Sequence, residues 1–317
     1  MNPEYFQHLV QTSEAYQGYS FKPVDRPSQN TLLYFSNPGH KSYYLKIFSD
    51  KPDEMGESSE MKAQRELIVS RLIQETLGIP TSRSIYLGED NFGSVALLQE
   101  EVFGLPFDTL MNEANNFPRE SIENIALEAG IYLSRIHRIT SSSFGDISNI
   151  GDKFLTWEDC FTQNMTKHLE IGLGLGILNK KHVDYFIDRL NSPLLNRFSS
   201  TPTLCHGDFA PQNIIIDTDS YRIAGIVDFE LAKYWIPGWD LVRSCVALEL
   251  TKVNSDLMDA FIKGYASLGR LSEDDIRLQI EYYKPFENLN YWIWAWSKSG
   301  LQDKIKADIS GVTGIPY

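Results

Sequence analysis

Apolar and polar positions in the first third of the chain follow two different periods. Residues 42–48 alternate and are rich in aromatic side chains, which is typical of a half-buried β-strand. Residues 58–78 predict a helix, because Ser58 or Ser59 can cap its start and Gly78 with Pro80 ends it. Its apolar positions recur near the helical period at Met61, Ile68, Leu72 and Ile73. Residues 21–35 predict two strands around a polar turn, and residues 94–104 predict a further strand.

Helical periodicity dominates the rest of the chain. One apolar helix face is marked by Ile122, Ala126, Ala129, Leu133 and Ile136, and Gly238 opens another helix after Pro237. Between these helices, residues 213–217 and 222–228 are β-branched and apolar, with the turn formers 218–220 between them. They predict a β-hairpin. Because neighbouring strands lie roughly 5 Å apart, Asn213 and Asp228 should stand side by side at its open end.

Polar residues around this hairpin have the spacing that phosphoryl transfer from a metal-bound nucleotide requires. Asn213 and Asp228 offer two hard oxygen ligands, and Mg²⁺ prefers one or two such ligands together with phosphates and waters. Asp208 lies five residues before Asn213, in a loop that Gly207 and Pro211 make irregular, so it can point at an acceptor hydroxyl. Taken alone, these residues could be turn residues beside a buried hairpin. Asp208 and Asn213, followed fifteen residues later by Asp228, together favour a nucleotide site.

The same order of groups occurs in protein kinases, where an Asp, an Asn five residues later and a later Asp-Phe-Gly act together. Here His206-Gly207-Asp208 replaces His-Arg-Asp, and Asp228-Phe229-Glu230 replaces Asp-Phe-Gly. In this form the segment resembles the aminoglycoside phosphotransferase and choline kinase-like family of small-molecule kinases. The resemblance implies an α+β, bilobal protein kinase-like fold. We expect a small β-rich N-lobe at 1–100, a larger, mostly helical C-lobe at 101–317 and a hinge near 99–104.

The resemblance also implies nucleotide-binding residues in the N-lobe. Lys46 is the expected phosphate-contacting lysine, and Glu66 is its expected ion-pair partner, because the helix of Glu66 ends in the family's Leu-Gly-aliphatic-Pro pattern at 77–80. Backbone groups from Glu100 to Val102 should meet the adenine edge. The loop at 25–31 keeps the family's asparagine at Asn30 but lacks its glycines. Ser28 and Asn30 are therefore expected to contact the nucleotide through side chains or less closely.

Several other polar residues receive structural interpretations. In the family, an aspartate at the place of Asp240 fixes the catalytic loop, although a helix N-terminal carboxylate is an equally good account. His137 is favoured as a structural histidine. The glycines at 172–176 lack the spacing of a dinucleotide fingerprint, so a turn between helices is predicted. The 3 cysteines are odd in number and widely separated, which argues against a disulfide framework or a zinc site.

Composition sets outer bounds on the protein. A chain of 317 residues with 42% hydrophobic content can bury a sizeable core. Its start lacks an export signal, and no apolar run reaches roughly 18 residues, so we expect a cytoplasmic protein without membrane contact. A net charge of -13 disfavours a nucleic-acid partner and suits a cationic substrate. Ordinary cytosolic proteins are, however, often acidic too.

Acceptor-binding candidates lie in the C-lobe. Residues 156–161 begin a helix with Glu158 and Asp159, and residues 281–288 carry Glu281 and Glu287 ahead of an aromatic run at 291–296. Carboxylates and aromatic faces can hold cationic amines, although core packing is the commoner role of an aromatic helix. Glu230, at the end of the second motif, is a further candidate for acceptor binding.

These patterns lead to one main hypothesis and two alternatives. The main hypothesis is an O-phosphotransferase that uses Mg²⁺ with ATP or GTP and acts on a small, cationic hydroxyl compound, plausibly an aminoglycoside or another antibiotic. The first alternative is a metabolic kinase of choline, an amino alcohol or a sugar. The second is a nucleotide-binding regulatory protein without turnover, which the missing glycines near Ser28 suggest.

Overall fold

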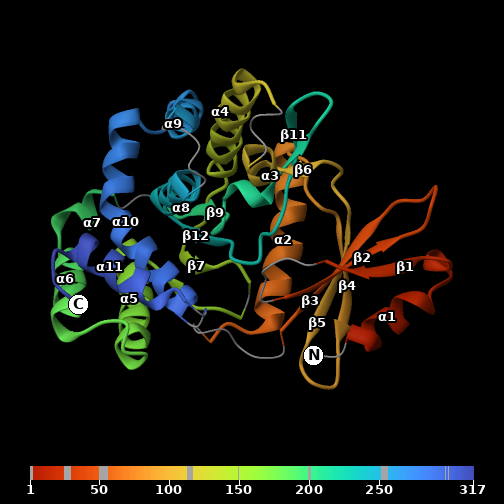
Figure 1. Cartoon of the computed structure of the whole chain (residues 1–317), viewed down its shortest axis with the longest axis horizontal. Helices are drawn as coiled ribbons and strands as arrows, with labels where there is room; N and C mark the ends of the chain where they lie inside the picture. The colour runs from red at the N-terminus through yellow and green to blue at the C-terminus, as the bar shows by residue number, and fades with distance from the viewer. Residues whose placement is uncertain are drawn as a thin grey trace.

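An antiparallel five-stranded sheet in the order β1-β2-β3-β5-β4 forms the N-terminal part of the chain (Figure 1). The computed structural model describes residues 3–24, 30–49, 56–112, 117–148, 150–198, 201–250, 256–296, 298 and 300–317. The strands of this sheet are β1 (Ser20–Pro23), β2 (Thr31–Ser36), β3 (Tyr43–Phe48), β4 (Ser84–Glu89) and β5 (Val95–Glu100). The predicted strands are confirmed, but β5 ends at Glu100, because residues 101–104 leave the sheet.

Two helices cover opposite faces of this sheet. Alternation along β3 sends Leu45 and Ile47 to one face, where they pack with Phe6 and Val10 of α1 (Pro3–Gln11). Phe48 points to the other face and packs with Ala63 of α2 (Ser59–Leu77). Lys46 shares the face of Phe48, so the strand period aims it at α2.

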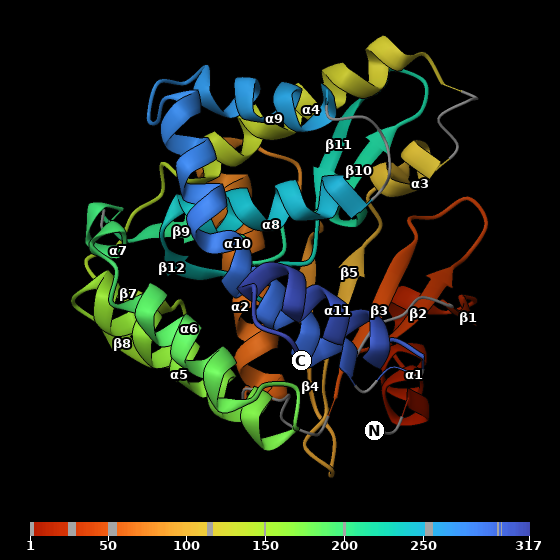
Figure 2. The same ribbon diagram turned by 60° about the vertical axis from the view of Figure 1, so that its left-hand side comes forward.

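The long helix α2 begins and ends where the sequence predicts. The Ser58 hydroxyl accepts a hydrogen bond from the Met61 backbone N–H at 3.3 Å, which satisfies one of the free N–H groups of the first turn. Gly78 ends the helix in the left-handed conformation at φ 62°. In both views α2 lies between the N-terminal sheet and the C-terminal helices (Figures 1 and 2).

Helices make up most of the C-terminal part, and they enclose the main hydrophobic core. Their bounds are α3 (Phe107–Asn112), α4 (Arg119–Ile136), α5 (Trp157–Gly174), α6 (Lys180–Leu190), α7 (Pro193–Arg197), α8 (Pro237–Leu250), α9 (Asp256–Ala266), α10 (Glu273–Trp296) and α11 (Gln302–Thr313). The glycines at 172–176 lie where α5 ends ahead of α6, so the predicted turn between helices is confirmed. Cys160, Cys205 and Cys245 are free and buried.

Two small sheets carry the segments that resemble the kinase motifs. One has the order β11-β10-β6, and the other has the order β8-β7-β12-β9. Their strands are β6 (Leu105–Pro106), β7 (Phe144–Asp146), β8 (Lys153–Phe154), β9 (Thr203–Cys205), β10 (Ile214–Asp217), β11 (Arg222–Ile226) and β12 (Lys233–Trp235). Strand β9 leads into His206, and the chain from β11 to β12 contains the Asp228-Phe229-Glu230 segment.

The predicted hairpin is β10 followed by β11. Ile214 pairs with Ile226, and the Asp217 carboxylate holds the turn by accepting the Asp219 backbone N–H and the Ser220 hydroxyl, both at 2.9 Å. At the open end, the Val227 N–H donates to the Asn213 carbonyl at 3.0 Å. The hairpin therefore brings Asn213 next to the residue before Asp228. The arrangement as a whole is α+β and bilobal, and none of the described helices is long and apolar enough to cross a membrane.

Candidate active site

Lys46 is surrounded by three carboxylates at the base of the N-terminal sheet. Its Nζ lies 2.7 Å from Asp228 Oδ1, 2.8 Å from Glu230 Oε2 and 3.5 Å from Glu66 Oε2. The Lys46 side chain is only 8% exposed. Burial alone would lower the pKa of Lys46, but the three carboxylates raise it well above its ordinary value. The lysine is therefore a buried, permanently charged group.

Glu66 is fully buried beside this lysine. Burial raises the pKa of Glu66 to about 7, against the opposing charge of Lys46. The Gln99 side-chain amide from β5 donates to Glu66 Oε1 at 3.0 Å and fixes the carboxylate. The Lys46–Glu66 contact that the resemblance implied is thus present as a long ion pair, and Asp228 and Glu230 lie closer to the lysine.

Asp208 and Asn213 lie together in the loop between β9 and β10. The Asn213 Nδ2 donates to both the Asp208 carbonyl and Asp208 Oδ2, at 2.9 Å each. Because the nitrogen of this amide faces Asp208, its oxygen is the atom left for a cation. Asp228 has a positive φ of 73° and a carboxylate that is 39% exposed. An amide oxygen and a partly exposed carboxylate on adjacent chain segments are a donor set that fits Mg²⁺.

A cation from α8 holds the other carboxylate oxygen of Asp208. Arg243 Nε and Nη2 both lie 2.8 Å from Asp208 Oδ1, and Arg243 Nη1 donates to Glu287 Oε1 of α10 at 2.7 Å. Glu287 is buried, and burial raises its pKa against the opposing charge of Arg243. The pair Asp208 and Glu287 therefore shares one guanidinium.

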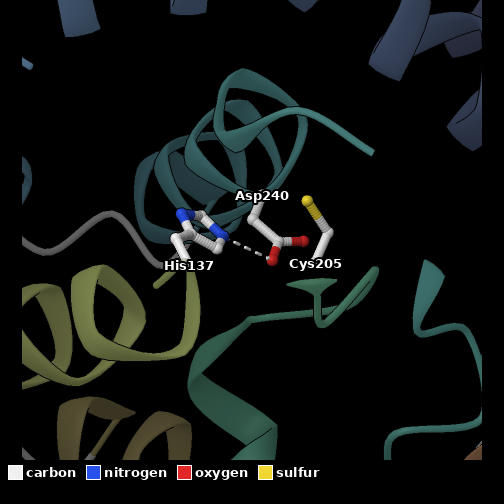
Figure 3. A group of neighbouring side chains, drawn as sticks. All are labelled: His137, Cys205 and Asp240. Carbon is white, nitrogen blue, oxygen red and sulfur yellow. Dashed lines mark hydrogen bonds and ion pairs between the residues drawn. The ribbon is translucent and has the colours of Figure 1, made fainter. Parts of the chain in front are cut away.

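Asp240, at the start of α8, fixes the backbone of the loop that follows β9. Its Oδ2 accepts the His206 N–H at 2.6 Å, and its Oδ1 accepts the Gly207 N–H at 2.8 Å. Figure 3 shows the same carboxylate with His137 and Cys205. His137 Nε2 lies 3.1 Å from Asp240 Oδ2, and its Nδ1 lies 2.8 Å from the Tyr265 hydroxyl. This supports the predicted structural role of His137.

The ligand atoms of His137, Cys205 and Asp240 lie within 4.8 Å of one another, but their hydrogen bonds already use them. Burial lowers the pKa of His137 and raises that of Cys205 well above its ordinary value, so the thiol stays protonated and donates to the Ile236 carbonyl at 3.2 Å. The cluster is a hydrogen-bonded support for the loop and does not offer the thiolate that a metal prefers.

The contacts of Gly207 and His206 explain why these two residue types precede Asp208. Gly207 has φ +82°, and a Cβ there would lie 2.2 Å from the Leu231 carbonyl oxygen, so only glycine fits. The His206 Nδ1 accepts the Asp208 N–H at 3.2 Å, which leaves Nε2 to donate to the Val227 carbonyl at 3.1 Å. His206 thus ties Asp208 to the segment that carries Asp228.

The predicted hinge residues and the described loop residue Asn30 differ in the contacts that they make. Glu100 uses its backbone N–H for Arg83 O at 2.8 Å and its carbonyl for the Ser82 hydroxyl at 2.7 Å. Within the described part of the chain, no hydrogen bond pairs the backbone N–H and C=O groups of Val102, so they can bond to an adenine edge. Asn30 donates to Glu230 Oε2 at 2.6 Å, while Ser28 lies outside the described residues.

The acidic acceptor candidates do not gather around Asp208. Glu158, Asp159 and Glu281 are exposed, and the Asp159 carboxylate accepts from the Thr156 hydroxyl at 2.6 Å in the first turn of α5. Within the part of the chain that the structure describes, no hydrogen bond or ion pair joins these three to the site. Glu287 reaches Asp208 only through Arg243, and Glu230 contacts Lys46 and Asn30.

Sequence reasoning missed two arginines. Arg243 stands three residues after Asp240 in an otherwise apolar helical stretch, a signal that its charge has a buried partner. Arg65 is fully buried and bonds Glu57, Asp146 and the Glu230 carbonyl. Beside it lies a polar cavity of about 210 Å³, with Glu57, Asp146, Lys167 and Lys233 in its wall.

The fold and the site together define a kinase of protein kinase-like fold. The site has a lysine–glutamate pair under an antiparallel sheet and a second aspartate beside the lysine. It also has a loop aspartate with an asparagine five residues later. Comparisons with known proteins agree. A profile of the phosphotransferase enzyme family matches residues 21–273. The chain belongs to this family and is a small-molecule phosphotransferase.

Solved structures share the fold at low sequence identity. The GDP complex of wild-type aminoglycoside 2'-phosphotransferase-IIIa is 14% identical, with 99% of each chain covered and a TM-score of 0.68. A putative fructosamine-3-kinase from Thermobifida fusca YX-ER1 is 16% identical, with 96% of each chain covered and a TM-score of 0.67. ADP-bound aminoglycoside phosphotransferase APH(2'')-Ib is 15% identical, with 99% of this chain and 97% of that chain covered and a TM-score of 0.65. No curated protein matches the chain.

Proposed function

We propose that this protein transfers the γ-phosphoryl group of ATP or GTP to a hydroxyl of a small molecule that carries amino groups. The observation that carries the proposal is the set of contacts around Asp208. Its carboxylate accepts from Asn213, the Asn213 carbonyl accepts from Val227, and the next residue, Asp228, pairs with Lys46. This is the spacing of a nucleophile-orienting carboxylate beside a phosphate site.

Asp208 orients the acceptor hydroxyl and accepts its proton as the new P–O bond forms and the bond to the nucleoside diphosphate breaks. Lys46 contacts the phosphates and neutralises their charge, and Glu66 holds the lysine in place. Mg²⁺, when held by the Asn213 amide oxygen and the Asp228 carboxylate, supplies further charge neutralisation at the phosphates. The Val102 backbone faces the adenine or guanine edge, and Asn30 covers the nucleotide from the β1–β2 side.

Two observations support an acceptor with amino groups. The net charge is -13, and the exposed carboxylates of Glu158, Asp159 and Glu281, although no described contact joins them to Asp208, add to the long-range attraction of a cation by the C-lobe. Arg243 places a positive charge directly beside Asp208, so the amino groups belong away from the reacting hydroxyl. A polyol with amines several bonds from that hydroxyl, such as an aminoglycoside, meets both conditions.

A second candidate is a metabolic kinase of a sugar-derived amine. The likeness to a putative fructosamine-3-kinase, at a TM-score similar to that of the aminoglycoside enzyme, favours it. It shares the donor site and the chemistry, and it differs only in the acceptor and in the biological role.

Transfer of γ-labelled phosphate from ATP and from GTP to a panel of aminoglycosides, fructosamines, choline and amino alcohols tests the proposal. We expect Mg²⁺-dependent labelling of at least one amine-bearing acceptor, and the preferred class separates the two candidates. Nucleotide binding without transfer to any acceptor would contradict the proposal and favour a non-catalytic nucleotide-binding protein.

A further inference from the structure

We propose that Arg243 and Glu287 are positioning residues for Asp208, and that Arg243 supplies a fixed positive charge on the acceptor side of the reaction. This inference rests on the proposed function, because it assigns Asp208 as the group that orients the acceptor hydroxyl. Neither residue belongs to the catalytic loop, and they come from α8 and α10.

A neutral amide and a cation hold the two carboxylate oxygens of Asp208. Asn213 donates to Oδ2, and the Nε and Nη2 of Arg243 share Oδ1 in a forked contact. Because both nitrogens contact the same oxygen, they fix the position of Oδ1, and the Asn213 contact to Oδ2 supplies the second point that orients the carboxylate. One lone pair of Oδ2 then remains to accept the proton of the acceptor hydroxyl.

Glu287 holds the arginine from behind. Its side chain is 3% exposed, whereas that of Arg243 is 30% exposed, so the guanidinium lies between a buried anion and the open side of the loop. The Asn290 amide lies 3.4 Å from the second oxygen of Glu287. A buried ion pair gives little net stability, because desolvation offsets the attraction. The burial of Glu287 is therefore better explained by its effect on the position of Arg243 than by a contribution to the stability of the fold.

Arg243 also retains donors for the reaction. Its described contacts use Nε, one N–H of Nη1 and one N–H of Nη2, which leaves two of its five N–H groups on a side chain that is 30% exposed. These N–H groups can donate to the acceptor's ring oxygens or to the oxygens of the moving phosphoryl group. The same positive charge disfavours an ammonium group next to the reacting hydroxyl.

The test uses the full-length protein and water as the phosphoryl acceptor, so it does not depend on the identity of the acceptor. Release of phosphate from MgATP or MgGTP is measured for the wild type and for Arg243→Ala, Arg243→Lys and Glu287→Gln. We expect kcat to fall about 10²-fold in Arg243→Ala and about tenfold in Glu287→Gln, with the nucleotide KM unchanged within about twofold. The kcat of Arg243→Lys should lie between those of Arg243→Ala and Glu287→Gln, because lysine keeps the positive charge but lacks the paired N–H donors of the guanidinium.

Chemical rescue separates positioning from a merely structural role. Millimolar guanidinium should restore part of the Arg243→Ala rate and should leave the wild type unchanged. Arg277→Ala is the matched control, because it removes an exposed arginine of α10 that pairs with Asp259 at 2.9 Å. Its kcat should equal that of the wild type.

Each outcome decides between the claims. A wild-type rate in Arg243→Ala, or a loss of nucleotide binding together with kcat in all three variants, would overturn the inference and leave the proposed function standing. A wild type that consumes no nucleotide, either with water or with any acceptor of the panel, contradicts the proposed function, and the inference falls with it. If Arg243→Ala does not fold, Glu287→Gln and Arg243→Lys must show the drop in kcat at unchanged KM.

Discussion

At the scale of single residues, Arg65 links three segments that are far apart in the sequence. It lies on α2 next to Glu66, and it bonds the Glu57 carboxylate at 2.7 Å and the Glu230 carbonyl at 3.2 Å. Lys233 of β12 also reaches Glu57, at 2.7 Å. Burial acts to raise the pKa of Glu57, but Lys233 and Arg65 outweigh it and hold the pKa below its ordinary value of 4.5.

The replacement Glu57→Gln tests this network. Because the folded pKa is depressed, the ionised carboxylate stabilises the fold above about pH 4.5, and this stabilisation is lost as the pH falls further. We expect Glu57→Gln to lower the free energy of unfolding by about 3 kcal/mol at neutral pH. In urea titrations, the difference from the wild type should stay constant from about pH 7 to about pH 5 and should shrink as the pH is lowered to about pH 3.

Glu75→Gln is the control for that experiment. Glu75 pairs with Arg71 in an exposed contact on α2, so its loss should leave the free energy of unfolding nearly unchanged. A Glu57→Gln difference that stays constant across the acid range would contradict the ion-pair account.

Glu230 occupies a different environment from the one that its motif suggested. It stands where protein kinases have glycine, and its carboxylate contacts Lys46 and Asn30. Burial raises its pKa, with Asp228 adding to the effect and Lys46 opposing it. In the donor site that we propose, nucleotide phosphates approach this carboxylate, and a divalent cation would offset the repulsion.

We therefore expect Glu230→Gln to bind nucleotide about tenfold more tightly than the wild type when Mg²⁺ is removed with EDTA. With Mg²⁺ present, the difference should be smaller. Titration of a fluorescent nucleotide under both conditions measures it, with the exposed Glu89→Gln as control. Equal metal-free affinities of Glu230→Gln and the wild type would contradict repulsion by Glu230.

At the scale of elements, α8 is the support of the catalytic loop. Its first turn places Asp240 under the His206 and Gly207 backbone N–H groups, and Ser244 one turn later donates to the Phe209 carbonyl at 2.7 Å. The helix therefore holds the loop on both sides of Asp208, and Arg243 on the same helix reaches the Asp208 carboxylate itself.

Asp240→Asn should disturb both stability and turnover. The two carboxylate oxygens of Asp240 now accept from three N–H groups, those of the His206 backbone, the Gly207 backbone and the His137 ring. An asparagine amide offers only one acceptor oxygen, so one buried donor loses its partner. We expect unfolding to become easier by about 2 kcal/mol and kcat to fall about 10²-fold, as measured by denaturation and by nucleotide turnover. Asp184→Asn, at an exposed position of α6, should change neither quantity appreciably. Wild-type turnover in Asp240→Asn would show that the loop keeps its shape without this carboxylate.

The elements themselves could be predicted well from the sequence, because their signals are local. The cap at Ser58, the stop at Gly78 and the turn at Asp217 lie within a few residues of the bonds they make. The register of β10 against β11 followed from the same local turn, and it placed Asn213 near Asp228. The contacts of Glu230 and Arg243 could not be read in this way. Asn30 is 200 residues from Glu230, and Arg243 reaches across to α10.

At the scale of the whole molecule, a charged cluster around Lys46 joins the two lobes. Lys46 comes from the N-terminal sheet, and Asp228 and Glu230 come from the segment that follows the C-lobe hairpin. The boundary near residue 100 and the hinge at 99–104 stay predictions. The lobes were predictable because order and spacing of the motifs reflect the whole fold, whereas the acceptor surface depends on helices whose acidic residues carry no motif.

The central claim is that Asp208 orients the hydroxyl that receives the phosphoryl group. The most direct measurement compares the wild type with Asp208→Asn for transfer of γ-labelled phosphate to the best acceptor of the panel, with nucleotide affinity measured in parallel. We predict a loss of transfer of about 10³-fold at a nucleotide affinity within about threefold of the wild type. Equal transfer rates in the two proteins would contradict the account.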